Sequence, residues 1–391
     1  MKILIIVHHP TLKGGAYFRG QGFAKPLARR GHDVTMMTIA PSNRFKLVER
    51  QVENFRVIES PDLLSGIGRT GWDPWDTFRR CLWMHGEQFD IIHTVDSRPA
   101  VSLPAAYGRK VTGAKWVADW TDWWGRGGAT SERPGWLIKT FVGPLEQWFE
   151  EQPKKWADGL ITISHALAER AAGMGLDRSR MLYLPPGADP DAIRTTSKEA
   201  ARQKLGLEGN ARYIGYLGNI YQRDADLMFS AVEQLQANDA KLVMIGGGAF
   251  NIKSQLGDRL IQTGHVPFPT MLDYLSACDV LALPLSDTVA NRGRWPSKIN
   301  EYVAVGRPTV ACAVGDLSHL FEQHNIGSLV QPEVSDFAEK LDALLADPAA
   351  AEAMGNAARQ LAQTDYAQDR VAERLEAYYE RVINNFEGET S

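Results

Sequence analysis

Two adjacent glycines, Gly14 and Gly15, stand immediately before a helical pattern near the start of the chain. Backbone N–H groups at the amino end of a helix can bind an anion, and the positive end of the helix dipole favours negative charge there. These residues therefore indicate a site for a diphosphate. Two glycines alone suit an ordinary loop between a strand and a helix even better, so this interpretation depends on the rest of the sequence.

Histidines and paired aspartates are the other groups that could bind a metal or move a proton. His8 and His9 end one apolar run and His93 ends another, but their spacing is not that of metal ligands, which favours structural roles. Asp224 and Asp226 form a D-x-D pair that opens a helical segment instead of following a strand. We therefore expect no catalytic metal and no cofactor.

Two more carboxylates, Asp119 and Asp122, lie in the segment KWVADWTDWWGRGG. A carboxylate at a strand end can position an acceptor hydroxyl or stabilise positive charge that develops on a reacting carbon. Either aspartate can equally well cap the turn that follows it. The residues alone leave these roles open.

The elements that must position these groups follow an alternating pattern of strands and helices, which predicts parallel sheets. The expected strands are 2–7, 33–39, 55–60, 90–95, 115–120, 159–164 and 180–185, then 213–218, 241–248, 279–285 and 308–313. The pattern breaks near Pro185-Pro186-Gly187 and then restarts. We expect an α/β fold with an N-terminal domain 1–187, a C-terminal domain 188–364, and a helix and tail at 365–391.

Open parallel sheets bind ligands at the carboxyl ends of their strands, so we expect two Rossmann-like domains that face each other across a cleft. The fold alone does not establish the chemistry.

Composition narrows the class of protein. The 391 residues are 44% hydrophobic and 23% charged, as in ordinary globular proteins, and the net charge of −4 does not favour nucleic-acid binding. Cys81, Cys278 and Cys312 are too scattered for a disulfide framework or a zinc site and fit a reducing compartment. No apolar run suits a signal peptide or reaches the roughly 18 residues of a membrane span. We expect a cytoplasmic protein with at most peripheral contact with the inner face of the membrane.

Several motifs occur in a specific order in the second half: YLGN, KLVMIGGG, GHV, DVLALPL and EYVAVGRPTV. In this order and spacing the chain resembles the family 4 glycosyltransferases, which are retaining enzymes of the GT-B fold. The resemblance extends from the first strand to the last helix, and it implies a C-terminal helix that packs back towards the N-terminal domain.

The resemblance also implies roles for single residues. Gly14 and Gly15 occupy the place of the loop that approaches the donor diphosphate, Arg223 and Lys298 would neutralise the leaving diphosphate, and Glu301 would accept hydrogen bonds from the ribose. The expected donor-binding residues are Gly14, Gly15, Gly218, Asn219, Gly247, Gly264, His265, Val266, Ser297 and Glu301. The expected catalytic residues are Asp122, Arg223 and Lys298.

The chain departs from the family pattern at one position. The family often carries an earlier glutamate that touches the donor sugar, and Gly293 stands in its place here. Its neighbours Arg292 and Arg294 suit contact with a negatively charged or acylated sugar, or simple solvation. Asp122 with Trp124 matches a subgroup that has an aspartate where many relatives have a histidine.

Tryptophan is concentrated in the segment 116–156, and several roles fit it. Indole has an apolar body and a polar N–H, so the group could form a sugar platform or a membrane-interface belt, although core packing is the favoured interpretation. The tryptophans of this segment are Trp116, Trp120, Trp123, Trp124, Trp136, Trp148 and Trp156.

The expected function is transfer of a sugar from a nucleoside-diphosphate sugar to an acceptor hydroxyl of a carbohydrate, lipid-linked or small-molecule substrate, with retention and without a metal. A nucleotide-sugar epimerase of the same architecture and a non-catalytic nucleotide-sugar-binding protein are the alternatives. The sequence does not name the base, the sugar, the acceptor or the oligomeric state.

Overall fold

The computed structural model describes residues 1–64, 70–125, 127–130, 140, 142–190, 192–247 and 256–386. The chain divides into two compact units. Unit 1 holds Met1–Pro186, Arg292–Trp295 and the C-terminal segment from Gln368, and unit 2 holds Gly187–Asn291 and Pro296–Ala367. The first division, between Pro186 and Gly187, lies beside the boundary expected from the sequence.

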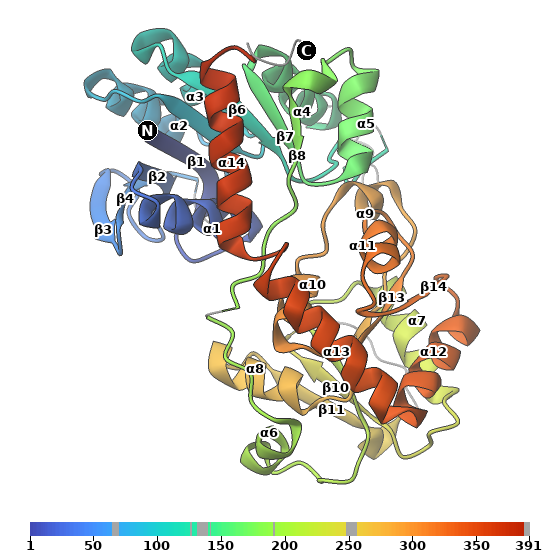
Figure 1. The fold of residues 1–391 in the computed structure, drawn as a ribbon. Helices are drawn as coiled ribbons and strands as arrows, with labels where there is room; N and C mark the ends of the chain where they lie inside the picture. Colours follow the sequence, from blue (N-terminus) through green and yellow to red (C-terminus); the bar gives the residue numbers. More distant parts are fainter. Residues whose placement is uncertain are drawn as a thin grey trace. The chain divides into compact units, whose positions relative to one another are not determined.

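The described residues of unit 1 form an eight-stranded sheet in the order β3-β4-β2-β1-β5-β6-β7-β8 (Figure 1). All neighbours are parallel except β3 and β4, an antiparallel pair that the sequence analysis did not anticipate. The strand order reverses direction between β1 and β5. The strands are β1 (Lys2–Pro10), β2 (Asp33–Ile39), β3 (Val48–Val52), β4 (Phe55–Ser60), β5 (Ile91–Val95), β6 (Lys115–Trp120), β7 (Gly159–Thr162) and β8 (Met181–Tyr183).

Helices cover both faces of this sheet. Because parallel crossovers are right-handed, the helix that leads from β1 to β2 lies on the face opposite to those that connect the strands from β4 to β8. The C-terminal helix α14 packs beside α1. The helices of unit 1 are α1 (Gly15–Arg29), α2 (Pro74–Trp83), α3 (Pro99–Thr112), α4 (Gly143–Trp156), α5 (His165–Gly173) and α14 (Gln368–Ile383).

The C-terminal helix is fastened to unit 1 by buried tyrosines. The Tyr378 hydroxyl accepts a hydrogen bond from the backbone N–H of Leu160 at 2.8 Å and donates to the carbonyl of Arg180 at 2.5 Å. The hydroxyl of the fully buried Tyr379 lies 2.5 Å from Nδ1 of His93. The return of the last helix to the N-terminal domain, which the family resemblance implied, is therefore confirmed.

A buried charge network lies beneath this helix. Arg19 of α1 donates to both carboxylate oxygens of Asp119, at 2.5 and 2.9 Å, and to the carbonyl of Leu184. Burial alone would raise the pKa of Asp119, but Arg19 and His93 together hold it below its ordinary value. Asp119 therefore has a structural role in the core of unit 1. Of the two aspartates, Asp122 is left as the candidate for a catalytic role.

We expect Asp119→Asn to lower the free energy of unfolding by about 3–5 kcal/mol, because it leaves the Arg19 guanidinium buried without its counter-charge. Urea denaturation followed by circular dichroism measures this change. Glu169→Gln breaks the solvent-exposed pair with Arg178 and is the matched control, for which no measurable change is expected. Equal stabilities of the two variants would show that the buried pair is not structurally important.

Unit 2 repeats the architecture with a parallel six-stranded sheet among its described residues, in the order β11-β10-β9-β12-β13-β14. The chain proceeds from β9 to β11 on one side and then continues from β12 on the other, so the order reverses between β9 and β12. The strands are β9 (Tyr213–Leu217), β10 (Lys241–Ile245), β11 (Leu260–Gly264), β12 (Val280–Leu283), β13 (Thr309–Cys312) and β14 (Gly327–Val330).

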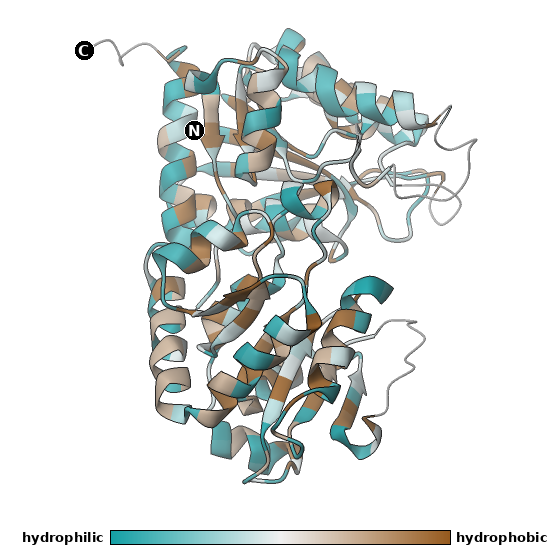
Figure 2. Cartoon of the chain, turned by 90° about the vertical axis from the view of Figure 1, so that its right-hand side faces the viewer, coloured by the Kyte–Doolittle hydropathy of each residue, from teal (hydrophilic) through white to brown (hydrophobic). Residues whose placement is uncertain are grey.

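Helices alternate with these strands. Hydrophobic residues concentrate on the strands of each unit, while the helices carry both kinds of residue (Figure 2). The sequence predicted two α/β, Rossmann-like domains, and each of the two units is one such domain. The helices that follow α5 and precede α14 are α6 (Lys198–Leu205), α7 (Gln222–Glu233), α8 (Phe268–Ala277), α9 (Val289–Gly293), α10 (Lys298–Val305), α11 (Leu317–Gln323), α12 (Val334–Ala346) and α13 (Pro348–Gln363).

Candidate functional site

Glycines end two adjacent strands of unit 2 and let their backbones approach closely. Gly218 follows β9 with φ of 83°, and Gly246 follows β10 with φ of 122°, in the region that favours glycine. A Cβ on Gly246 would lie 3.0 Å from the Gly218 Cα, and one on Gly247 would lie 2.6 Å from Nε2 of His265. The carboxyl ends of β9, β10 and β11 therefore form a tightly packed edge whose surface is largely backbone.

Lys298, the first residue of α10, lies against this edge. Its Nζ donates to the carbonyl of Asn219 at 3.2 Å and lies 4.8 Å from the ring centroid of Tyr216. The Tyr216 hydroxyl donates to the same carbonyl at 2.8 Å. The ammonium group is thus held beside Gly218, near the point where the strand order reverses, which is where open α/β sheets bind ligands.

Glu301 lies one turn further along α10 and is half-buried. Burial raises its pKa to about 7, and the nearby Lys298 opposes that shift. The neighbouring Tyr302 is fully buried and fixes the helix, because its hydroxyl accepts from the N–H of Leu217 at 3.0 Å and donates to the carbonyl of Ala282 at 3.2 Å. Ser297 precedes the helix, is exposed, and makes no capping hydrogen bond with its side chain.

The other candidates in unit 2 are more exposed. Arg223 lies in the first turn of α7 with its side chain in solvent, and Gly264 and His265 are exposed at the end of β11, followed by the half-buried Val266. Asp224, beside Arg223, is buried and accepts a hydrogen bond from the N–H of Ser286 at 2.8 Å. Asp224 and Asp226 thus lie at the start of α7, as the sequence indicated.

In unit 1, the glycine pair lies where β1 turns into α1. Gly14 has φ of 79°, and a Cβ there would overlap the ring of His9. Nδ1 of His9 accepts a hydrogen bond from the N–H of Ala16 at 3.2 Å. Gly15 has no other group within 4 Å of the place where its Cβ would lie, so the start of α1 is open beside it.

Asp122 follows β6 in a loop that α4 holds in place. Glu150 of α4 accepts hydrogen bonds from the backbone N–H groups of Trp124 and Gly125, at 2.9 and 2.6 Å, and the Trp120 indole donates to the Asp122 carbonyl at 2.9 Å. Burial raises the pKa of the Asp122 carboxyl to about 7, and the charge of Asp96 adds to the shift. A carboxyl group that titrates near neutrality is typical of a catalytic position.

Asp96 is a further acidic residue of unit 1, to which no sequence motif pointed. This residue follows β5, is buried, and has φ of 69°, which is uncommon for a residue other than glycine. Its carboxylate lies 3.7 Å from Nε2 of the buried His8, whose Nδ1 has no hydrogen-bond partner within the structure described. Burial lowers the pKa of His8 well below its ordinary value, so the ring is neutral at pH 7. The conformational strain at Asp96 has no signal in a single sequence.

The departure at Gly293 has a packing explanation. This residue belongs to unit 1, and a Cβ there would lie 2.6 Å from the Cβ of Trp123. Ser164 donates to the Gly293 carbonyl at 3.0 Å, which fixes the backbone. A glutamate cannot enter this position unless Trp123 moves. Arg292 is exposed and Arg294 is half-buried, and the charge of Arg294 lowers the pKa of Asp122.

We expect Gly293→Ala to lower the free energy of unfolding by about 1–3 kcal/mol, and Gly293→Glu by at least as much, because overpacking displaces Trp123. Thermal denaturation measures both variants. Gly173→Ala is the matched control, since nothing lies within 4 Å of the added carbon, and it should be neutral or slightly stabilising. A Gly293→Glu variant as stable as the original protein would contradict this packing explanation.

The tryptophans of the segment 116–156 divide into several groups. Trp116 and Trp120 are fully buried, as the favoured core interpretation predicted, and Trp123 and Trp124 are half-buried. Trp148 and Trp156 are exposed, and Trp136 lies outside the described residues.

Among the residues that the structure describes, no group of three or more His, Cys, Asp or Glu side chains is arranged as a metal site.

Two models of protein families match the sequence of this chain. The model described as Glycosyl transferase 4-like domain matches residues 14–187, and the model described as Glycosyl transferases group 1 matches residues 211–347. The two matches correspond to the two units and together cover most of the chain. The chain belongs to this family of glycosyltransferases, as the sequence motifs indicated.

Particular relatives match parts of the chain. The D-inositol 3-phosphate glycosyltransferase of Stackebrandtia nassauensis is 30% identical over 219 residues, which are 51% of this chain and 48% of the relative. The enzyme of the same name from Mycobacterium tuberculosis is 28% identical over 267 residues, 63% of this chain and 53% of the relative. The chain thus spans about half the length of the curated relatives it matches.

Solved structures show the fold over the whole chain. Sucrose-phosphate synthase from Thermosynechococcus elongatus gives a TM-score of 0.74 at 17% identity and covers 98% of this chain and 100% of its own. Anabaena HepE in complex with UDP gives 0.69 at 16% identity, with 96% and 99% covered. WaaG, a glycosyltransferase involved in lipopolysaccharide biosynthesis, gives 0.68 at 17%, with 97% and 99% covered. The GT-B prediction is confirmed.

Proposed function

We propose that this protein transfers a sugar from a nucleoside-diphosphate sugar to an acceptor hydroxyl, with retention of anomeric configuration and without a metal or other cofactor. The observation that supports this proposal best is the arrangement in unit 2 of Lys298, Gly218 and Asn219 at the carboxyl end of β9, with Glu301 one helical turn away. This edge offers a cation for a diphosphate and a carboxylate for a ribose diol.

The reaction requires that negative charge on the departing diphosphate be stabilised as the bond to the sugar breaks. We assign this role to Lys298 and Arg223 in unit 2 and to the Gly14–Gly15 backbone in unit 1. An ammonium, a guanidinium and the amino end of a helix all act most strongly when that charge develops, and so they lower the barrier. Gly247, Gly264, His265, Val266 and Ser297 are assigned to the nucleotide as expected from the family resemblance.

The acceptor proton must also be removed. We assign to Asp122 the positioning of the acceptor hydroxyl, and an oxygen of the donor phosphate takes the proton on the same face as the new bond forms. Arg292 and Arg294 are assigned to the sugar, since their charges suit an acidic or acylated substituent. The acceptor belongs to the carbohydrate, lipid-linked or small-molecule alcohols, as the names of the relatives suggest.

The class of donor has support from the structural neighbours. HepE was solved with UDP and with UDP-glucose, and a starch synthase from Arabidopsis thaliana was solved with ADP and acarbose. These ligands were bound to those proteins, whose identity to this chain is at most 16%. They support a nucleoside diphosphate as the common element, and the base is left to experiment.

Thermal-shift measurements with UDP-, GDP-, ADP-, CMP- and dTDP-sugars, each with and without EDTA, test the proposal. A ligand that binds the native state raises Tm. We expect one donor to raise Tm equally in both conditions and to lose this effect in Glu301→Ala. Because the pKa of Glu301 is raised to about 7 and the carboxylate accepts the ribose hydrogen bonds, the shift should grow as the pH rises through 7.

Each contrary result bears on a different part of the proposal. A donor whose effect disappears with EDTA would overturn metal independence. No shift with any donor would contradict the nucleotide site. A donor that is converted to its epimer in the absence of acceptor would favour the epimerase alternative, and a bound donor that is never consumed with a broad panel of acceptors would favour a binding protein.

A further inference from the structure

Three neighbouring helices of unit 1 present large apolar side chains to solvent. Helices α2, α3 and α4 pack in sequence, α2 against α3 and α3 against α4, on the face of the sheet opposite to α1. Their exposed apolar residues, each between 38% and 55% exposed, are Phe78, Leu82, Leu103, Val111, Leu145, Trp148 and Trp156. We call this surface the α2–α4 face. Exposed large apolar side chains gathered on neighbouring helices indicate an interaction site.

The charges of the α2–α4 face have one sign. The carboxylates of these three helices are Asp76, Glu146, Glu150 and Glu151, and all are buried. Each is turned inward to an arginine: Asp76 to Arg80, Glu146 to Arg98, and both Glu150 and Glu151 to Arg170. The exposed charged residues of the three helices are Arg109, Lys110 and Lys155.

Inward pairing of every carboxylate leaves the outer surface of α2–α4 apolar and positive. A soluble surface ordinarily mixes charges of both signs. A partner that complements this surface must offer an apolar layer beneath a layer of negative charge. A bilayer with anionic head groups has this arrangement.

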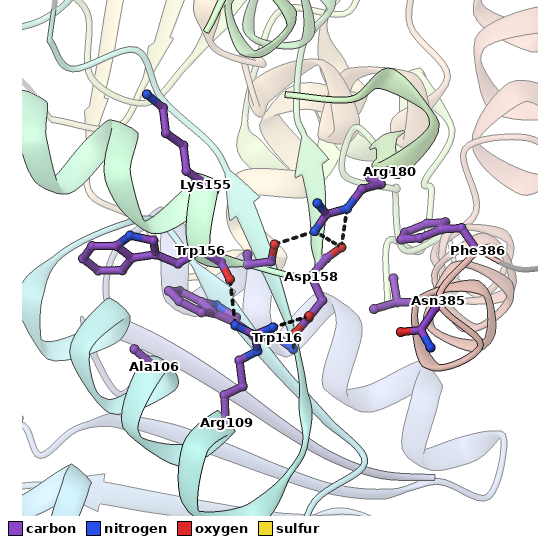
Figure 3. Close-up of a pocket in the computed structure, with 11 residues that line it drawn as sticks. Ala106, Arg109, Trp116, Lys155, Trp156, Asp158, Arg180, Asn385 and Phe386 are labelled. Carbon is purple, nitrogen blue, oxygen red and sulfur yellow. Dashed lines mark hydrogen bonds and ion pairs between the residues drawn. The ribbon is translucent and has the colours of Figure 1, made fainter. Parts of the chain in front are cut away.

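A cavity of about 740 Å³ opens at the end of this face, between α3, the end of α4 and the C-terminal end of α14 (Figure 3). It lies at the amino ends of β6 and β7, the edge of the sheet opposite to Asp122. Arg109 donates to the Asp158 carboxylate at 2.6 Å, and Arg180 donates to the carbonyl of Ala157 at 2.7 Å, so both guanidinium groups are held in the wall. With Lys155 they give the lining a net positive charge, which suits a phosphate head group.

The aromatic residues at this end favour the same partner. The rings of Trp148 and Trp156 meet edge to face with centroids 5.5 Å apart, and Trp156 also borders the cavity. Indoles beside basic residues are enriched where proteins meet the head-group layer, because the ring is apolar and its N–H is polar.

No helix in the described ranges is long and apolar enough to cross a bilayer.

We propose that unit 1 docks through the α2–α4 face onto a membrane surface that carries anionic phospholipids. Trp148, Trp156 and the neighbouring leucines enter the head-group layer, and Arg109, Lys110 and Lys155 attract the lipid phosphates, one of which occupies the cavity at the end of α3. The docking is reversible, because contacts between side chains and head groups form and break without any covalent change.

Vesicle flotation with the full chain tests this proposal. We expect the protein to float with vesicles of phosphatidylcholine and phosphatidylglycerol at low salt, and to remain in solution with vesicles of phosphatidylcholine alone. Leu145→Ser with Trp148→Ser should lower the floated fraction at least about tenfold, and Lys110→Glu with Lys155→Glu should remove the dependence on phosphatidylglycerol. Circular dichroism and Tm confirm that each variant is folded.

A matched control comes from unit 2. Phe268 is 50% exposed and Lys340 is 43% exposed, and Phe268→Ser with Lys340→Glu makes the same kinds of change away from the α2–α4 face. This variant should float as the original protein does. Absence of flotation with anionic vesicles would overturn the proposal, as would equal losses in the control and the two α2–α4 variants. A soluble protein that self-associates through these residues without binding vesicles would also overturn it.

Discussion

Replacing Asp122 by asparagine should lower kcat by about 10²- to 10³-fold, with a smaller effect on KM for the donor. The carboxylate is assigned to the positioning of the acceptor hydroxyl, and an amide supplies neither the negative charge nor the same acceptor strength. Steady-state kinetics with the donor found by thermal shift, and an acceptor identified by screening, measure the change.

The pH dependence separates this role from a purely structural one. Because burial raises the pKa of Asp122 to about 7, and the active form is the carboxylate, kcat/KM should rise with pH through 7 and level off above about pH 8. Asp122→Asn should remove this ionisation from the profile. A rate that falls as pH rises through 7 would show instead that the protonated form is active.

Stability supplies the control for this variant. A carboxyl group whose folded pKa is raised stabilises the fold at pH below its unfolded pKa, and this contribution is lost as the pH rises through the folded pKa. The ionised Asp122 therefore costs stability above pH 7, and Asp122→Asn should be at least as stable there as the original protein. An inactive variant that is also unfolded would point to a structural role for Asp122.

Replacing Lys298 by alanine should lower kcat/KM by about 10²- to 10³-fold, since it removes a cation beside the charge that grows on the diphosphate. Lys298→Arg should recover only part of the loss. A planar guanidinium does not fit the place that Nζ occupies between the Asn219 carbonyl and the Tyr216 ring as a compact ammonium does.

Comparison of ligands locates the effect of Lys298. The affinity for a nucleoside diphosphate, measured by calorimetry, should fall in Lys298→Ala, whereas the affinity for the nucleoside alone should not change, because Lys298 is assigned to the phosphates. Lys340→Ala removes an exposed lysine elsewhere in unit 2 and should leave both affinities unchanged. Equal loss of nucleoside and nucleotide binding would place Lys298 outside the phosphate site.

Regular elements with strong local patterns were predictable. The strands β2, β4 and β6 have the limits that the sequence indicated, because their apolar runs are buried on both faces of a parallel sheet and end at polar or turn residues. The last helix was also predicted, although it begins at Gln368. The short edge strands β3 and β14 were missed, since partly exposed residues carry little periodic signal.

The types of residue at the candidate site were determined by the sequence itself: the glycines at the start of α1 and after β9 and β10, the lysine and glutamate one turn apart on α10, and an aspartate after β6. The order and spacing of these residues also indicated the family. They lie in loops that join a strand to the next helix, so each motif is a short continuous stretch of sequence. These features depend on neighbours along the chain, and a single sequence records them.

Tertiary structure decided what distant residues do to one another. Asp119 and Asp122 are three positions apart, yet Arg19 holds one in the core while burial beside Asp96 raises the pKa of the other to about 7. Trp123 excludes a glutamate at position 293, and the inward pairing of four carboxylates leaves the α2–α4 face without exposed negative charge. Burial, electrostatic shifts and packing limits arise from contacts between distant segments, so only the folded chain determines them.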